Sequence, residues 1–188
     1  LTTNTGTSWR YRGLSSSFIY SFALNGTNLF AGTGNGLFLS TDRGVVWTSL
    51  GLTWYRVYAL SVSGTNLFAG TDRGVLRSTN NGIDWTPASI GLADTNVWCM
   101  AVDGMNLFAG TFGGVYRSTN DGAQWTPAGM TTSHIQSLVI SGTNLFASTG
   151  YNVFLTTNNG ANWTPVSSGL QNTIVQSLFI NGGSLFAG

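Results

Sequence analysis

Side chains with useful chemistry are few in this sequence of 188 residues. The chain has no Lys and no Glu, so its seven basic side chains are all Arg and its six acidic side chains are all Asp. It has one histidine, His134, and one cysteine, Cys99. No His, Cys or acidic cluster surrounds His134, so we expect neither a metal site nor a cofactor. Cys99 lies in an apolar run, which favours a small buried side chain.

Acidic residues offer little to an enzyme that would hydrolyse a glycoside. Ordinary glycosidases place two carboxyl groups on either side of the bond that they break. Four of the acids fall in predicted turns, namely Asp42, Asp84, Asp103 and Asp121. Only Asp72 and Asp94 can share one face of the molecule, and we therefore expect no catalysis and no catalytic residues.

Aromatic and charged residues in predicted loops are better candidates for a binding site. Rings offer stacking platforms and polar groups fix a ligand's orientation, which suits a glycan or a peptide. The candidates are Trp54, Tyr55, Arg56, Tyr58, Asp72, Arg73, Trp98, Phe112, His134 and Tyr151. Two alternatives stay open at this point. The loops can differ by neutral drift, and the position shared by Tyr20, Tyr58, Trp98, Gln136 and Gln176 can serve packing alone.

An internal repeat of about 40 residues positions these side chains. Asn-Leu-Phe-Ala begins at four places, Asn28, Asn66, Asn106 and Asn144, and Ser184 begins a fifth variant. A second string ends in a tryptophan, and successive tryptophans are 38, 38, 40 and 38 residues apart. Such regular spacing over the whole chain predicts one domain built from five similar units, covering residues 1–188.

Each unit is predicted to contain four short strands. In the second unit these are residues 57–62, 66–70 and 74–78, followed by a strand around Trp85. Gly and Asn occupy the turns, and apolar runs indicate strands that are buried on both faces. The expected fold is an all-β, five-bladed β-propeller of four-stranded antiparallel blades. The blades are predicted at 15–52, 53–92, 93–130, 131–170, and 171–188 together with 1–14.

The chain starts and stops inside a unit of the repeat, which predicts how the ring closes. Residues 1–14 resemble the second half of a unit and residues 171–188 the first half. We expect both termini to form the last blade. Part of its third strand is missing, so either the natural chain continues or a neighbouring copy supplies a strand to the open edge.

The string Ser/Thr-x-Asp/Asn-x-Gly-x-x-Trp resembles the Asp-box, or BNR, repeat of sialidases, sortilin-type receptors, photosystem II assembly factors and bacterial surface proteins. The resemblance implies a β-propeller in which the box residues are structural. The matching positions are Asn4, Trp9, Asp42, Trp47, Asn80, Trp85, Asn120, Trp125, Asn158 and Trp163. Sialidases of this family pair a tyrosine nucleophile with Glu, and a chain without Glu cannot form that pair.

The composition also limits which classes of function the protein can have. Charged residues make up only 7% of the chain and the net charge is +1, which gives no electrostatic case for nucleic acid. No apolar run is long enough to span a membrane. Solubility rests on Ser, Thr, Asn and Gly, which favours an extracellular or cell-surface location. We expect a non-enzymatic domain that binds a glycan or a protein. The alternative is a building block of a surface layer, fibre or multi-propeller protein that contacts further copies of itself.

Overall fold

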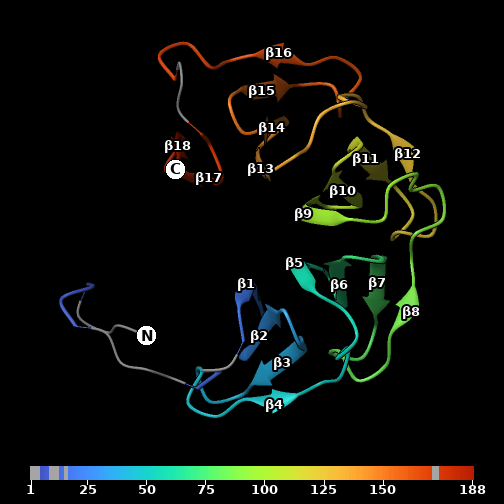
Figure 1. Cartoon of the computed structure of the whole chain (residues 1–188), viewed down its shortest axis with the longest axis vertical. Helices are drawn as coiled ribbons and strands as arrows, with labels where there is room; N and C mark the ends of the chain where they lie inside the picture. Colours follow the sequence, from blue (N-terminus) through green and yellow to red (C-terminus); the bar gives the residue numbers. More distant parts are fainter. Residues whose placement is uncertain (1–4, 9–12, 15–16, 171–173) are drawn as a thin grey trace.

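A computed structural model describes residues 5–8, 13–14, 17–170 and 174–188. Over these residues every regular element is a β-strand. Four antiparallel four-stranded sheets and one two-stranded hairpin follow one another around a central axis (Figure 1). The sheets radiate outward from the axis, so the all-β propeller predicted from the repeat is confirmed.

Each blade runs outward in chain order from an inner to an outer strand. Blade 1 contains β1 (Ile19–Asn25), β2 (Asn28–Thr33), β3 (Gly36–Ser40) and β4 (Thr48–Ser49). Blade 2 contains β5 (Val57–Ser63), β6 (Asn66–Thr71), β7 (Gly74–Ser78) and β8 (Thr86–Pro87). Blade 3 contains β9 (Val97–Asp103), β10 (Asn106–Thr111), β11 (Gly114–Ser118) and β12 (Thr126–Pro127). Blade 4 contains β13 (Ser137–Ser141), β14 (Asn144–Ser148), β15 (Val153–Thr156) and β16 (Thr164–Pro165). The hairpin contains β17 (Leu178–Asn181) and β18 (Ser184–Ala187).

Side-chain hydroxyls hold the turns between the third and fourth strands. In blade 2, the Ser78 Oγ accepts a hydrogen bond from the Gly82 N–H at 2.9 Å. The Asn80 Oδ1 accepts one from the Asp84 N–H, also at 2.9 Å. Asn81 and Gly82 both have left-handed backbone angles, with φ of 57° and 82°. Asparagine and glycine adopt this region more readily than other residues do, which explains the repeated Asn-Gly pair.

The same turn recurs in the other blades. Ser40, Ser118 and Thr156 take the place of Ser78, and all are buried. In blade 1 the acceptor is a carboxylate, and hydrogen bonds from the Val46 N–H and the Ser40 hydroxyl lower the pKa of Asp42. Thr5 and Gly6 repeat the left-handed pair with φ of 54° and 86°. The other two box residues of this copy, Asn4 and Trp9, lie outside the described residues.

The hydrophobic core lies between blades. The phenylalanines of the repeated Asn-Leu-Phe-Ala strand, Phe30, Phe68 and Phe108, are almost completely buried. Phe68 of blade 2 packs in one cluster with Leu107 and Trp125 of blade 3. A glycine near the end of this strand permits the close contact, because a Cβ on Gly70 would lie 2.7 Å from the Val97 Cγ1. Each blade therefore depends on its neighbours for burial.

The box tryptophans are not equally buried. Trp125 is 1% exposed, and its indole N–H donates to the carbonyl of Ala88 in the preceding blade at 2.7 Å. Trp163 makes the same bond to Ala128. Trp85 bonds instead to Gly82 of its own turn and is only half-buried. The expectation of mostly buried tryptophans therefore holds fully for Trp125 alone among those described.

The fifth blade is represented by the β17–β18 hairpin. Among the described residues no strand pairs with the free edge of β18, and all four of its residues are exposed. Figure 1 shows blade 1 and this hairpin at the two ends of the arc of blades. Closure by both termini depends on residues 1–4 and 9–12, which lie outside the described residues, so it stays a prediction.

We predict that Trp125→Ala lowers the free energy of unfolding by about 3–5 kcal/mol, as a large-to-small change in a packed core does. Trp85→Ala should cost clearly less, because that indole is partly exposed and bonds within its own turn. Urea unfolding of both variants checks the order. Equal costs would contradict the idea that bonds between blades make one tryptophan more important than another.

Candidate functional site

The loops between blades share one face of the propeller with the turns between second and third strands. We call it the variable face, because its loops differ from blade to blade. A buried threonine shapes three of these turns. The Thr71 hydroxyl donates to the Gly74 carbonyl at 2.8 Å and accepts from the Arg73 N–H at 3.0 Å. The residues at the turn tip are thus free to vary while the backbone stays fixed.

Five aromatic rings form a continuous row at the inner ends of these loops. Tyr20 meets Tyr58 edge-on with ring centres 5.1 Å apart, and Tyr58 stacks on Trp98 at 4.3 Å. Trp98 then contacts Phe112 and His134, both at 5.4 Å. Phe112 and His134 stack on each other at 4.1 Å. We call these five residues the aromatic row; it joins blade 1, blade 2, blade 3 and the loop that enters blade 4.

The aromatic row is only partly covered. Phe112 is 49% exposed and Tyr20 is 45% exposed, whereas Tyr58 is 9% exposed. Two polar atoms in the row, the Trp98 Nε1 and the His134 Nε2, are buried and have no hydrogen-bond partner among the described residues. Buried polar groups are usually paired, so two unpaired atoms within one row of rings are an unusual feature of this site.

Two arginines lie beside the aromatic row on the blade 2 loops. Arg73 lies over the ring of Tyr55, with 5.5 Å from the guanidinium carbon to the ring centre, which is a cation–π geometry. Hydrogen bonding to Tyr58, and then the charges of Tyr58 and Asp72, raise the pKa of Arg56. Both arginines are exposed, so their positive charge faces solvent at this place.

Two further candidates stand apart from the aromatic row. Trp54 and Tyr151 are 81% and 63% exposed, and within the described residues neither ring contacts another aromatic ring. Sequence reasoning left Tyr20 out of the candidate set, although it occupies the same repeat position as Tyr58 and Trp98. Phe18 and Ile174 were also not among the candidates, although they are 80% and 53% exposed. Their signal was an apolar residue at the end of an otherwise polar loop.

The two acidic residues of the variable face are already used by the backbone. The Asp72 Oδ1 accepts a hydrogen bond from the Arg56 N–H at 3.1 Å. The Asp94 Oδ1 accepts one from the Asn96 N–H at 2.9 Å. Asp72 thus joins its turn to the loop before β5, and Asp94 stabilises its own loop. Within the described ranges, no group of three or more His, Cys, Asp or Glu side chains is placed to hold a metal ion.

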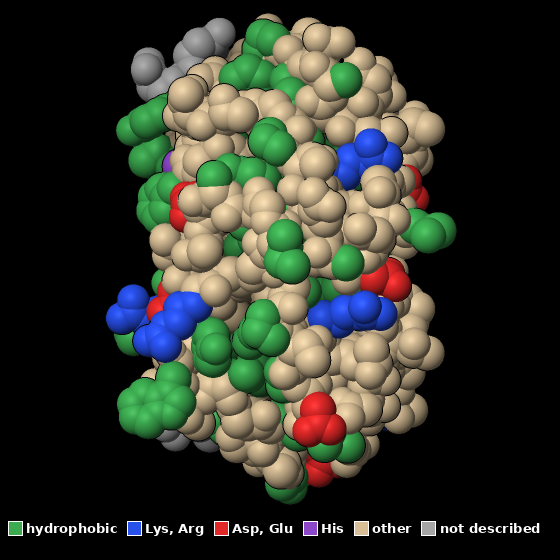
Figure 2. All heavy atoms as spheres, turned by 90° about the vertical axis from the view of Figure 1, so that its right-hand side faces the viewer, with side chains coloured by type: hydrophobic (Ala, Val, Ile, Leu, Met, Phe, Trp, Pro, Cys, Tyr) green, Lys and Arg blue, Asp and Glu red, His purple; other side chains and the backbone are tan. Residues whose placement is uncertain are grey.

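Burial changes the ionisation of two other groups. It lowers the pKa of His134, while the charge of Asp94 opposes this change. Burial also raises the pKa of the Cys99 thiol to about 12, so it stays protonated at neutral pH. Charge elsewhere is sparse, and Figure 2 shows Arg and Asp as scattered spots on a surface of mainly uncharged groups.

This arrangement of blades defines the class of protein, a β-propeller. An ancestral GH74 enzyme is 23% identical to this chain, with a TM-score of 0.75 over 92% of this chain and 28% of the enzyme. The extracellular domain of a putative one-component system from B. thetaiotaomicron is 18% identical, with a TM-score of 0.77 over 90% of this chain and 26% of that one. A chain of a nidogen/laminin complex is 11% identical, with a TM-score of 0.75 over 91% and 72%. At these identities the likeness concerns the fold alone, and the chain spans about a quarter of the first two structures.

The sequence also identifies the family. The DUF6242 beta propeller domain matches residues 69–179, which is more than half of the chain. The protein therefore belongs to the DUF6242 beta propeller domain family. No curated protein matches it significantly.

The lowered pKa of His134 predicts how stability depends on pH. A base whose folded pKa lies below its unfolded value contributes stability above the unfolded pKa, about 6.5. That stability is lost as the pH falls through the folded pKa. His134→Gln should therefore lose less stability than the wild type between about pH 7 and about pH 5. Urea unfolding at both pH values checks this, and identical losses would contradict it.

Proposed function

We propose that this chain is a non-enzymatic recognition domain that binds a glycan or a protein on its variable face. The supporting observation is the aromatic row, which combines exposed ring surface with two unpaired buried polar atoms. Aromatic and Arg side chains dominate binding hot spots, and Arg56 and Arg73 flank the row.

Several features favour binding over catalysis. The two carboxylates of the variable face accept backbone hydrogen bonds, and the chain has no Glu. The hydroxyl-capped turns support the interpretation as structural Asp-boxes, which lie on the opposite face. We also propose an extracellular or cell-surface location. It is supported by the low charge and by the extracellular domain named among the similar structures. Among the described residues there is no helix that is long and apolar enough to cross a membrane.

Phe112→Ala tests the proposed site, because Phe112 is exposed and joins Trp98 to His134. The purified chain should bind members of an array of glycans and peptides. The variant should weaken that binding roughly tenfold or more, which corresponds to about 1.4 kcal/mol. Ile83→Ala is the matched control, since Ile83 is 71% exposed on a turn of the opposite face. Its binding should equal that of the wild type.

Two results would contradict the proposal. One is binding that is unchanged in Phe112→Ala and in a Trp54→Ala, Arg56→Ala double variant. The other is turnover of sialosides or aryl glycosides that survives purification and is lost in Asp72→Asn or Asp94→Asn. The first would place the site elsewhere, and the second would make the protein an enzyme.

A second proposal is that the protein is a structural building block. Exposed apolar side chains at the two ends of the arc of blades favour it. Phe22 and Leu24 on β1 are 56% and 67% exposed, although they belong to an inner strand. Phe179 and Phe186 on the hairpin are 63% and 55% exposed. Apolar surface at both ends, beside the free edge of β18, suits contact with further blades.

Light scattering during size-exclusion chromatography tests the building-block proposal. The apparent mass should rise with concentration, and a Phe22→Ser, Phe186→Ser double variant should stay at the mass of one chain. Val45→Ser, Ile83→Ser is the matched control, because these residues are 51% and 71% exposed on turns between third and fourth strands and not on the strands at the ends of the arc. A constant mass for the wild type would contradict this proposal.

A further inference from the structure

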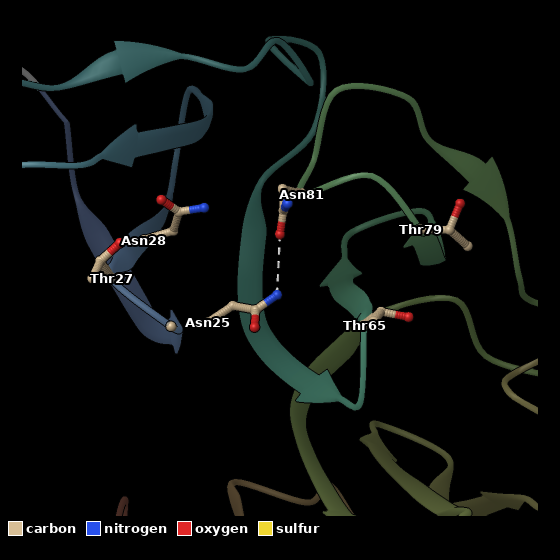
Figure 3. A pocket seen from close by; sticks show the side chains of 7 residues that line it. Asn25, Thr27, Asn28, Thr65, Thr79 and Asn81 are labelled. Atoms are coloured by element: carbon tan, nitrogen blue, oxygen red, sulfur yellow. Dashed lines mark hydrogen bonds between the residues drawn. The ribbon is translucent and has the colours of Figure 1, made fainter.

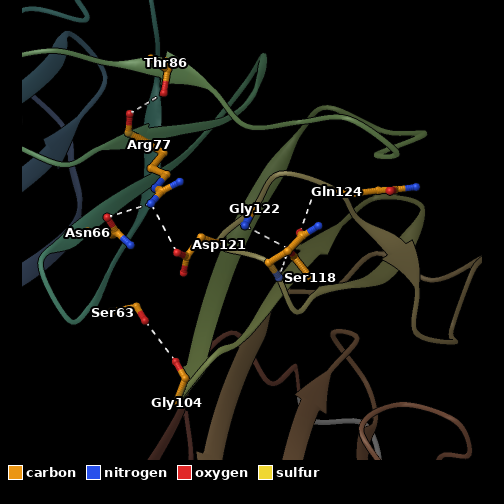
Figure 4. A network of polar contacts seen from close by, with 10 residues as sticks. Ser63, Asn66, Arg77, Thr86, Gly104, Ser118, Asp121, Gly122 and Gln124 are labelled. Carbon is orange, nitrogen blue, oxygen red and sulfur yellow. Dashed lines mark hydrogen bonds and ion pairs between the residues drawn. The ribbon is translucent and has the colours of Figure 1, made fainter.

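The face opposite the variable face contains the seams where neighbouring blades meet. At the seam between blades 2 and 3, polar side chains bridge the two sheets. The Ser63 hydroxyl donates to the Gly104 carbonyl at 3.1 Å. One nitrogen of Arg77 donates to the Asn66 Oδ1 at 3.2 Å and lies 3.4 Å from the Asp121 Oδ2 (Figure 4). The Arg77 side chain thus spans this seam.

The seam between blades 3 and 4 has an arginine at the same position of its blade. Arg117 donates to the Asn106 Oδ1 from two nitrogens, at 3.1 and 2.7 Å. Asn66 and Asn106 both begin the second strand of their blade. An arginine on the third strand therefore satisfies the asparagine of the second strand in both blades.

Blade 1 has no such arginine. Its third strand carries Leu39, which pairs in register with Phe30 as Arg77 pairs with Phe68. Leu39 packs on the apolar cluster of Phe30, Leu37 and Leu67. The asparagine of the second strand is Asn28, and within the described residues its side-chain amide makes no hydrogen bond. At the seam between blades 1 and 2 the acceptor, Asn28, is therefore present, but Leu39 stands where blades 2 and 3 have the donor arginine.

A hollow of about 410 Å³ lies at this seam of blades 1 and 2. One hydrogen bond crosses it, from the Asn25 Nδ2 to the Asn81 Oδ1 at 3.1 Å (Figure 3). Its lining consists of Asn25, Gly26, Thr27, Asn28, Thr65, Thr79 and Asn81. A second hollow of about 500 Å³ shares Gly26 and Thr27 with it and is also lined by Leu24, Thr41, Asp42 and Arg43. We call the first of these two hollows, which lies between the blades, the seam hollow.

The chemistry of the seam hollow fits a neutral sugar. Three amides and three hydroxyls line the seam hollow, and none of these groups is charged. An Asn amide offers both a donor and an acceptor, so it can pair with two neighbouring hydroxyls of a sugar ring. The volume lies in the usual range for small-molecule sites.

We propose that the seam hollow binds a neutral oligosaccharide, with Asn28 and Asn81 as its main polar contacts. The sugar hydroxyls take the place that the guanidinium of Arg77 has at the next seam. This site lies on the opposite face from the aromatic row, so it is independent of the function proposed above. An unmodified peptide is the competing ligand, and the experiment separates the two.

Leu39→Arg is the decisive variant, because it copies at this seam the arginine that blades 2 and 3 already carry. It should fill the hollow without disturbing the fold. NMR titration with cellotetraose, mannotetraose and chitotetraose at millimolar concentration should shift amide signals of Asn28 and Asn81 in the wild type. In Leu39→Arg the affinity should fall roughly tenfold or more, which corresponds to about 1.4 kcal/mol. Leu155→Arg is the matched control, since Leu155 holds the same position in blade 4, and it should bind like the wild type.

The reciprocal variant tests the same idea from the other side. Arg77→Leu opens the seam between blades 2 and 3 and should create new sugar-dependent shifts at Asn66. The proposal is overturned if none of the three sugars shifts the wild-type signals. It is also overturned if Leu39→Arg binds as tightly as Leu155→Arg, or if an unmodified Gly/Ser peptide causes the same shifts as the sugars. If array ligands bind Phe112→Ala as tightly as the wild type, only the proposal for the aromatic row is contradicted. The proposal for the seam hollow is not affected by that result.

Discussion

The structure depends on one packing contact, in which the phenylalanine of the second strand in blades 1, 2 and 3 is buried against the next blade. A four-stranded blade has two apolar faces and cannot cover either by itself. Phe68 solves this for blade 2 by packing with Leu107 and Trp125 of blade 3. Gly70, near the end of the same strand, lets Val97 approach closely enough for that contact. The turns and loops can vary only because this contact sets the spacing of the blades.

The fold was predictable because the repeat constrains it at several levels. The spacing of the tryptophans gives the blade length, and the Asn-Gly pairs mark turns in which both residues need left-handed angles. Strands predicted at 57–62, 66–70 and 74–78 appear as β5, β6 and β7 within one residue at each end. Local turn chemistry and long-range packing therefore point to the same structure, as expected for a sequence with little frustration.

The site was less predictable because contacts between blades do not follow from one repeat. Phe112 is a turn-tip residue and His134 a loop residue, and only the curvature of the arc brings their rings to 4.1 Å. The unequal burial of Trp85 and Trp125 has the same origin, since the indole partner lies in another blade for only one of them. Leu39 gives no signal by itself, and its meaning appears only beside Arg77 and Arg117.

The nearest-neighbour arrangement of the blades has a consequence for how the molecule comes apart. In such a chain, stability is approximately a sum of blade terms and seam terms. Among the described residues, blades 2, 3 and 4 have a neighbour on both sides, whereas β1 and the β17–β18 hairpin have exposed apolar residues. Local unfolding should therefore begin at β1 and at the β17–β18 hairpin and then spread toward β5–β12. Amide hydrogen exchange would then be slowest in the central blades, near Phe68 and Trp125.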